Sequence, residues 1–193
     1  MKILFGICGS FCCHKESIAV LETLCSVGHQ VTTVISNSAA TLETRFGKSG
    51  NIIEKAKTIT GNDPLLTIPS VEKTVTSGGF DLMFICPCTG NTLSKISQGI
   101  TDGAVTMATK AMLRNGKPIV IAFASNDGLS GSLKNIGNII NRKNFYFVPL
   151  RQDDYLNKPC SLVCDFSLSI PTLNNALSGK QLQPVLLSPQ KKE

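Results

Sequence analysis

Small polar residues follow the expected strands at places where a ligand could reach the backbone. The first place is Gly9-Ser10, with Phe11, directly after a short apolar run. Glycine lets the backbone approach a ligand closely, and the N-terminus of the helix that follows favours a phosphate. The segment lacks the third glycine of a dinucleotide fingerprint and the Gly-Lys-Ser/Thr of a Walker A loop. Taken alone, it indicates a plain turn and a phosphate site about equally.

Three further loops have the same character. Ser36 follows the second expected strand, where its hydroxyl could contact a phosphate or simply cap the next helix. The third strand ends at Pro87 and leads into a tight polar turn made of Thr89, Gly90, Asn91 and Thr92. Ser125 and Asn126 follow the fourth strand and also suit an ordinary turn. Because parallel strands end at one edge of a sheet, the four loops together predict a single ligand site.

The elements that must position these loops alternate between apolar strands and amphipathic helices. We expect strands at residues 2–8, 31–35, 82–86, 119–123 and 145–149. We expect helices at residues 14–27, 50–60, 70–77, 91–98, 103–115 and 131–141, and around Pro171 within 160–179. The alternation predicts an α/β fold, a single doubly wound domain of Rossmann-like or flavodoxin-like type with a mainly parallel sheet. The domain is expected over residues 1–180, with a C-terminal arm or tail over 181–193.

Composition favours a cytoplasmic protein with reduced thiols. The 193 residues are 42% hydrophobic and 17% charged, which suits one globular domain, and no apolar run reaches the roughly 20 residues of a membrane span. Eight cysteines form no C-x-x-C pair and only two histidines occur, so we expect neither a metal site nor a disulfide framework. The net charge of +6 is scattered, which argues against nucleic-acid binding and suits an acidic partner or an anionic metabolite.

The loops resemble those of the flavoproteins that include the phosphopantothenoylcysteine and lantibiotic cysteine decarboxylases. Pro87, Asn91 and Thr92 match the Pro-Ala-Ser-Ala-Asn-Thr loop of that family, and residues 88–90 replace its three small middle residues. Within the superfamily, the chain is similar to the dipicolinate synthase B subunits. That resemblance rests on segments spread over most of the chain: Thr44-Arg45-Phe46-Gly47, Thr89-Gly90-Asn91-Thr92-x-Ser94-Lys95, Thr101-Asp102, Ala108-x-Lys110-Ala111, Arg114-Asn115, Ser125-Asn126-Asp127, Gln152-Asp153-Asp154 and Lys158-Pro159-x-Ser161.

The resemblance implies an oxidoreductase subunit that binds FMN. Such a subunit would oxidise a dihydrodipicolinate precursor to dipicolinate, pyridine-2,6-dicarboxylate, during spore formation. A separate A subunit of NAD(P)-binding type would be its partner, and the chain itself would form a homo-trimer or a larger assembly. The flavin would supply the hydride chemistry, and Asn91 is the expected catalytic residue. By matched position, the FMN contacts would be Gly9, Ser10, Phe11 and Ser36 at the phosphate and ribityl end, Thr89, Gly90, Asn91 and Thr92 near the ring, and Ser125 and Asn126 closing the site.

A dicarboxylate substrate would require cations, so we expect Arg45 and Lys95 to bind it, although each also suits a solvated surface charge. The Asp153-Asp154 pair would repel such a substrate and is expected in a loop or subunit contact. The decarboxylases use a histidine after the second strand that is absent here, which argues against their reaction. His14 suits either an acid or base or a plain helix start. A non-catalytic flavin-binding or assembly subunit, and a flavin-dependent reductase or decarboxylase of another small acid, remain open.

Overall fold

A parallel sheet forms the centre of the protein. The computed structural model describes residues 1–48, 50–77 and 79–189. The five parallel strands lie in the order β2-β1-β3-β4-β5, which is the order of flavodoxin-like sheets. They are β1 (Lys2–Ile7), β2 (Gln30–Ile35), β3 (Leu82–Cys88), β4 (Ile119–Ser125) and β5 (Phe145–Phe147). The predicted α/β fold with a mainly parallel sheet is therefore confirmed.

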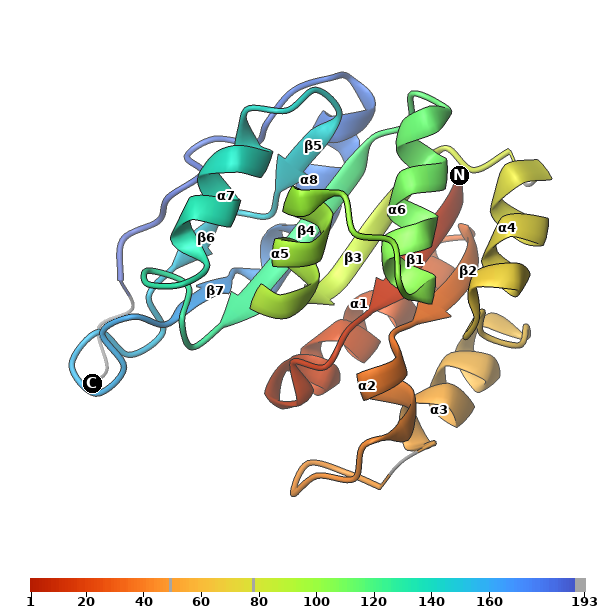
Figure 1. Ribbon diagram of the computed structural model, residues 1–193, viewed down its shortest axis with the longest axis horizontal. Helices are drawn as coiled ribbons and strands as arrows, with labels where there is room; N and C mark the ends of the chain where they lie inside the picture. The colour runs from red at the N-terminus through yellow and green to blue at the C-terminus, as the bar shows by residue number, and fades with distance from the viewer. Residues whose placement is uncertain (49, 78, 190–193) are drawn as a thin grey trace.

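Helices cover both faces of this sheet (Figure 1). One face carries α5 (Gly90–Gln98), α6 (Ala104–Arg114) and α7 (Leu133–Ile140), and the other carries α1 (His14–Ser26) and α8 (Ser169–Leu177). Three further helices follow β2 along the chain: α2 (Asn37–Thr41), α3 (Asn51–Thr60) and α4 (Ile68–Ser77). None of the helices in the described ranges is both long and apolar enough to cross a bilayer.

The central strands are buried on both faces, which explains why they appear in the sequence as continuous apolar runs. Every residue of β3 is buried, as is every residue of β1 after Lys2. The rings of Phe5 and Phe84 pack edge to face with 5.4 Å between their centroids. Because helices exclude water from both faces, alternating polar residues have no place in these strands.

The C-terminal third differs from the sequence-based expectation. The predicted helix over 160–179 was wrong in its first part, where β7 (Leu162–Cys164) pairs antiparallel with both the end of β4 and β6 (Leu150–Arg151). Strands of two or three residues are too short for a period to be visible. Pro171 lies in the first turn of α8, where no backbone N–H is needed. The third strand also continues past Pro87 to Cys88, with a register shift after Ile85.

The segment after residue 180 runs back along the sheet before the described residues end at 189. The side chain of Gln181 bonds the backbone N–H and carbonyl of Phe147, each at 2.7 Å. Leu150 donates its N–H to Val185 and accepts one from Leu187, both at 2.8 Å. The domain boundary at residue 180 stays a prediction, and residues 190–193 of the predicted tail lie outside the described residues.

Candidate functional site

A cleft of about 870 Å³ opens at the carboxyl ends of β1, β3 and β4. The chain leaves β1 for β2 on one side and later returns to the other side of β1 as β3, so the strand order switches between β1 and β3. Open α/β sheets bind their ligands at such a switch point. The structure brings most of the sequence-predicted cofactor residues together here: Gly9, Ser10, Phe11, Thr89, Gly90, Asn91, Ser125 and Asn126.

The loop after β1 is tied to the neighbouring strand end. The hydroxyl of Ser10 donates to the carbonyl of Ala124, at the end of β4, at 2.6 Å. A Cβ on Gly9 would lie 3.4 Å from the Cβ of Ser38 and 3.6 Å from the ring of Phe11, which is at the tight end of ordinary contact. A side chain at position 9 would therefore point at Ser38 and Phe11 and would have little room to extend.

The loop after β3 packs Gly90 against the loop after β4. A Cβ on Gly90 would lie 2.5 Å from Ser132 Oγ, 2.9 Å from Asp127 Oδ1 and 3.0 Å from Ser125 Oγ, so only glycine fits. Asp127 Oδ1 in turn accepts hydrogen bonds from the Ser125 and Ser132 hydroxyls, at 2.5 and 2.9 Å. Sequence reasoning did not single out Asp127 or Ser132 as site residues. Asp127 belongs to the segment Ser125-Asn126-Asp127 that carries the family resemblance, whereas Ser132 lies outside it and had no sequence signal.

The first turn of α5 presents Asn91 to the cleft. Thr89 caps this helix, because its Oγ1 accepts the Thr92 N–H at 3.1 Å. Asn91 is exposed, and its amide forms no hydrogen bond with any other part of the chain that the structure describes. The amide therefore offers both a donor and an acceptor to a ligand in the cleft.

Ser36, Thr92 and Lys95, also predicted as site residues, line a second hollow of about 570 Å³ instead. Asn91 lines both spaces, so the hollow adjoins the cleft. Ser36 caps α2 by accepting the Ala39 N–H at 3.3 Å. The ammonium group of Lys95 lies 2.7 Å from Asp102, and this ion pair lowers the pKa of Asp102, chiefly through the hydrogen bond from Lys95.

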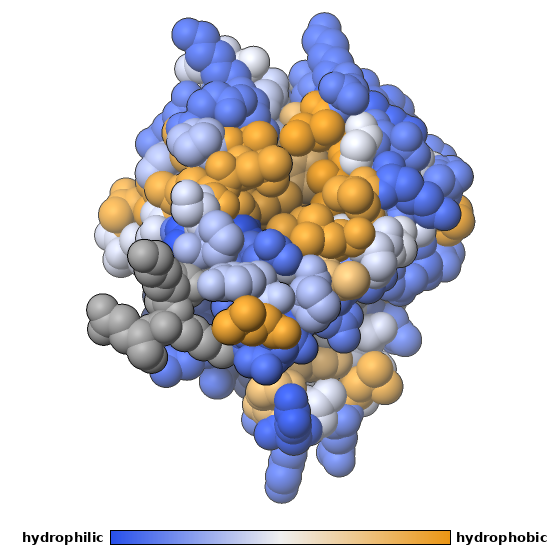
Figure 2. All heavy atoms as spheres, turned by 90° about the vertical axis from the view of Figure 1, so that its left-hand side faces the viewer, coloured by the Kyte–Doolittle hydropathy of each residue, from blue (hydrophilic) through white to orange (hydrophobic). Residues whose placement is uncertain are grey.

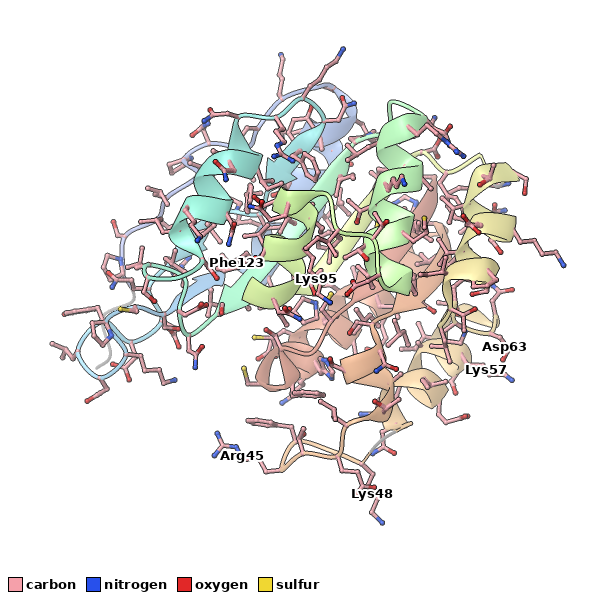
Figure 3. The ribbon with its side chains drawn as sticks, viewed as in Figure 1. Arg45, Lys48, Lys57, Asp63, Lys95 and Phe123 are labelled. Atoms are coloured by element: carbon pink, nitrogen blue, oxygen red, sulfur yellow. The ribbon has the colours of Figure 1, made fainter. Side chains whose placement is uncertain are left out.

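Two cationic side chains line the cleft from loops other than those after β1, β3 and β4. Arg45 projects from the loop between α2 and α3 (Figure 3) and lies over the ring of Phe46, with 4.8 Å from its Cζ to the ring centroid. Lys158, on the loop between β6 and β7, lies 3.5 Å from Asp153. Sequence reasoning missed Lys158 as a site residue. Asp153 lies in a loop, as expected, and this loop also lines the cleft. The sequence pointed to Asp153 and Lys158 only through the family resemblance of the segments 152–154 and 158–161.

His14 lies beside the cleft, and its ring forms a hydrogen bond with the backbone. Its Nε2 donates to the Cys8 carbonyl at 2.8 Å, and its ring packs on Phe11 with 5.2 Å between centroids. Burial lowers the pKa of His14, the bond to Cys8 opposes this shift, and the charge of Lys55 adds to it. The ring is therefore neutral at pH 7, and it lines a neighbouring cavity of about 540 Å³ rather than the cleft.

All eight cysteines are unpaired. Burial raises the pKa of Cys8 to about 11 and that of Cys88 well above its ordinary value, so both act as small apolar side chains. Cys12 is exposed, with its Sγ 3.7 Å from the Sγ of the buried Cys13. Within residues 1–48, 50–77 and 79–189, no group of three or more His, Cys, Asp or Glu side chains is arranged to hold a metal ion.

The chain is similar in sequence and fold to known flavoproteins. The profile of the Flavoprotein family matches residues 1–169. The dipicolinate synthase B subunit of Bacillus subtilis (strain 168) is 34% identical over 186 residues, which cover 96% of this chain and 93% of that protein. The crystal structure of the dipicolinate synthase B subunit from Bacillus halodurans has a TM-score of 0.88 and 37% identity, covering 98% of this chain and 97% of that one. A dodecameric FMN-dependent UbiX-like decarboxylase from Escherichia coli O157:H7 has a TM-score of 0.63 and 25% identity, covering 77% and 80%.

Proposed function

The chain belongs to the Flavoprotein family, as a relative of the dipicolinate synthase B subunit, and on that premise we propose that it is the FMN-binding B subunit of a dipicolinate synthase. In this proposal it oxidises a dihydrodipicolinate precursor to dipicolinate during spore formation, in the cytoplasm and together with an A subunit. The observation that carries the proposal is the convergence of the loops after β1, β3 and β4 on one cleft at the switch point of the sheet.

The residues of the cleft fit a flavin mononucleotide. The volume of the cleft, about 870 Å³, lies within the range of about 300–1,000 Å³ that small-molecule sites occupy. The glycine at 90 lets the loops after β3 and β4 pack closely beside the cleft, and the amide of Asn91 is free to bond a ring edge. The FMN-dependent relative from Escherichia coli supports the same cofactor.

Each loop has a separate task in this proposal. Gly9, Ser10 and Phe11 in the cleft and Ser36 in the adjoining hollow hold the phosphate and ribityl end. Thr89, Gly90 and Asn91 in the cleft and Thr92 in the hollow lie beside the ring. Ser125, which Asp127 orients, closes the site with Asn126. Hydride acceptance is the chemistry that FMN supplies when bound, and the protein supplies orientation and hydrogen bonds. Asn91 is the proposed catalytic residue because its free amide is the polar group best placed to bond both ring and substrate.

One observation favours a second candidate, a flavin-binding subunit that supports its partner without catalysis. Within the described residues, no histidine lines the cleft, and Nε2 of the nearby His14 is bonded to a backbone carbonyl. Asp127 is already engaged by two hydroxyls. The other carboxylate among the lining residues, Asp153, is paired with Lys158. A cleft whose proton acceptors are engaged in this way suits cofactor storage or assembly as well as oxidation.

The absorbance spectrum of the purified protein tests the cofactor first. We expect flavin bands that persist through gel filtration, and an FMN-dependent rise in melting temperature, since about 100 Kd of ligand stabilises the folded state by about 2.7 kcal/mol. A colourless protein that cannot be reconstituted with FMN contradicts the proposal.

Asn91→Ala then separates the two candidates. Retained FMN with lost turnover of the dihydrodipicolinate precursor, assayed with the A subunit, favours catalysis in this chain. Unchanged turnover favours the supporting role. Asn115→Ala, at an exposed position at the end of α6, is the matched control.

A homo-trimer or larger assembly is part of the same proposal. Figure 2 shows apolar side chains gathered on the side of the molecule that lies to the left in Figure 1. Leu133, Leu156 and Leu186 are 48%, 77% and 68% exposed. Exposed apolar surface of this kind favours contact with other subunits, and the relative from Escherichia coli is a dodecamer.

A further inference from the structure

Two cations reach the cleft from loops other than those proposed to hold the flavin. We propose that Arg45 and Lys158, rather than Arg45 and Lys95, hold the two carboxylates of a small dicarboxylic acid in the cleft. The inference rests on the proposed function for the flavin, but both cations belong to this chain whether or not FMN is bound. Each lines the 870 Å³ cleft, and they come from segments more than a hundred residues apart in sequence.

Arg45 lies on a short turn that is closed by hydrogen bonds. The backbones of Thr44 and Gly47 bond each other in both directions, at 3.0 and 3.1 Å, and the Phe46 N–H donates to Thr44 Oγ1 at 3.1 Å. The guanidinium lies over the Phe46 ring, and Arg45 forms no ion pair in the described parts of the chain. An arginine positioned in this way can bind a carboxylate through two parallel hydrogen bonds without first losing another partner.

Lys158 is presented by a loop whose backbone is internally bonded. Its N–H donates to the Asp154 carbonyl at 2.7 Å, and its own carbonyl accepts the Ser161 N–H at 3.0 Å. The Cys160 carbonyl accepts the Leu129 N–H at 2.9 Å, which ties this loop to the one after β4. The antiparallel pairing of β7 with β4 thus delivers Lys158 to the cleft in a defined place.

The cleft is lined by two cations, Arg45 and Lys158, and by two carboxylates, Asp127 and Asp153, so its attraction for a dianion depends on a ligand that reaches both cations. The ammonium of Lys158 lies 3.5 Å from Asp153 in a loose ion pair. The Lys158 side chain is 57% exposed, so a carboxylate ligand can share its ammonium with Asp153. Asp153 repels a carboxylate that binds beside it at Lys158, so the second contact, with Arg45, is needed to hold the ligand. A ligand with one carboxylate satisfies one cation only.

Lys95 does not meet these conditions. Its ammonium is 2.7 Å from Asp102, its side chain is 33% exposed, and it lines the adjoining hollow rather than the cleft. Figure 3 shows it on α5, whereas Arg45 lies at the tip of the loop below. A carboxylate at Lys95 would have to displace an existing carboxylate of the protein.

Isothermal titration of the FMN-loaded protein with pyridine-2,6-dicarboxylate, in buffer free of divalent cations, tests the pair. We expect Arg45→Gln and Lys158→Gln each to weaken binding roughly 10-fold or more, because each removes one charge-assisted contact. Lys158→Arg should restore most of the affinity. Lys95→Gln is the matched control and should change the dissociation constant by less than about 2-fold.

Pyridine-2-carboxylate provides the second arm. The wild-type protein should prefer the dicarboxylate over this monocarboxylate, and Lys158→Gln should abolish most of that preference. The inference is overturned if Lys158→Gln binds the dicarboxylate like the wild type, if Lys95→Gln loses as much, or if the wild type shows no binding at about 10 mM ligand.

Failure of the flavin proposal gives a different result. A protein that takes up no FMN contradicts the proposed function, and the same titrations on the FMN-free protein then decide whether the two cations bind the dicarboxylate. Conversely, flavin bands together with no dicarboxylate binding overturn the cation pair and leave the cofactor proposal standing.

Discussion

At the scale of single residues, two helical glycines differ in what surrounds them. A Cβ on Gly90 would meet three polar atoms at 3.0 Å or less, whereas a Cβ on Gly137 would meet nothing within 4 Å. We expect Gly90→Ala to lower the free energy of unfolding by about 1–3 kcal/mol, because the clash forces apart the loops after β3 and β4. Gly137→Ala should instead raise it by about 0.5–1 kcal/mol through helix propensity. Urea unfolding of both variants measures this contrast.

FMN titration of the same two variants measures their affinity for the cofactor. Gly90→Ala should also weaken FMN binding, since the displaced loops line the cleft, and Gly137→Ala should leave it unchanged. Equal stability of the two variants would show that the packing around Gly90 is looser than described.

His14 predicts a pH dependence of stability. Its pKa in the folded protein is lowered from the ordinary 6.5, chiefly by burial, so the unfolded chain binds a proton more readily. The resulting stability is fully present above pH 6.5 and is lost as the pH falls through the folded-state pKa. We expect the midpoint in urea to decrease between about pH 7 and 5, and to decrease less in His14→Gln.

His29→Gln is measured beside His14→Gln, to separate the contribution of the other histidine to the same pH dependence. The pKa of His29 is also lowered, by burial and by the N-terminal amine, but this residue lies at the opposite end of α1. If His14→Gln and the wild type lose stability in parallel over this range, burial of His14 does not govern the effect.

At the scale of elements, substitutions of Ser36, the cap of α2, can distinguish its role in the helix from its proposed role in binding the cofactor. Its hydroxyl accepts the Ala39 N–H, and aspartate caps a helix as well as serine does. We expect Ser36→Ala to lower the free energy of unfolding by about 1 kcal/mol and Ser36→Asp to leave it unchanged. If Ser36 contacts the FMN phosphate as proposed, Ser36→Asp should weaken FMN binding roughly 10-fold or more through like-charge repulsion.

Flavin fluorescence titration of the wild type and both variants measures this effect. A Ser36→Asp protein that binds FMN like the wild type would place the phosphate away from α2. Serine would then serve at this position only as a helix cap.

At the scale of the whole molecule, the net charge of +6 bears on the partner. A basic subunit that docks on an acidic A subunit should associate more weakly as salt screens the charges, over a Debye length of about 10 Å at 0.1 M. We expect the dissociation constant of the complex to increase steadily between low and high salt in sedimentation experiments. An affinity indifferent to ionic strength would exclude charge steering as the basis of docking. The same sedimentation runs on the isolated chain report whether it is a trimer or larger.

Much of the architecture could be predicted because its causes are local. The strands at β1, β3 and β4 are continuous apolar runs since both their faces are buried, and the small residues at 9, 10 and 90 follow directly after them. The parallel order then places those loops at one edge without further information. The short antiparallel strands β6 and β7 carry no period of their own and depend on pairing with β4, so the sequence pattern alone could not show them.

The sequence by itself therefore determined the fold class and the small-residue loops, because apolar periodicity and turn chemistry act between near neighbours. Only the tertiary structure decided which charges share the cleft. Lys95 follows the Asn91 loop closely in sequence, yet the bond to Asp102 holds it in a neighbouring hollow. Lys158 is far from that loop in sequence, yet the pairing of β7 with β4 brings it to the cleft. The ion pair of Lys95 with Asp102 and the pairing of β7 with β4 both form only once the chain is folded, so apolar periodicity and turn chemistry do not reveal them.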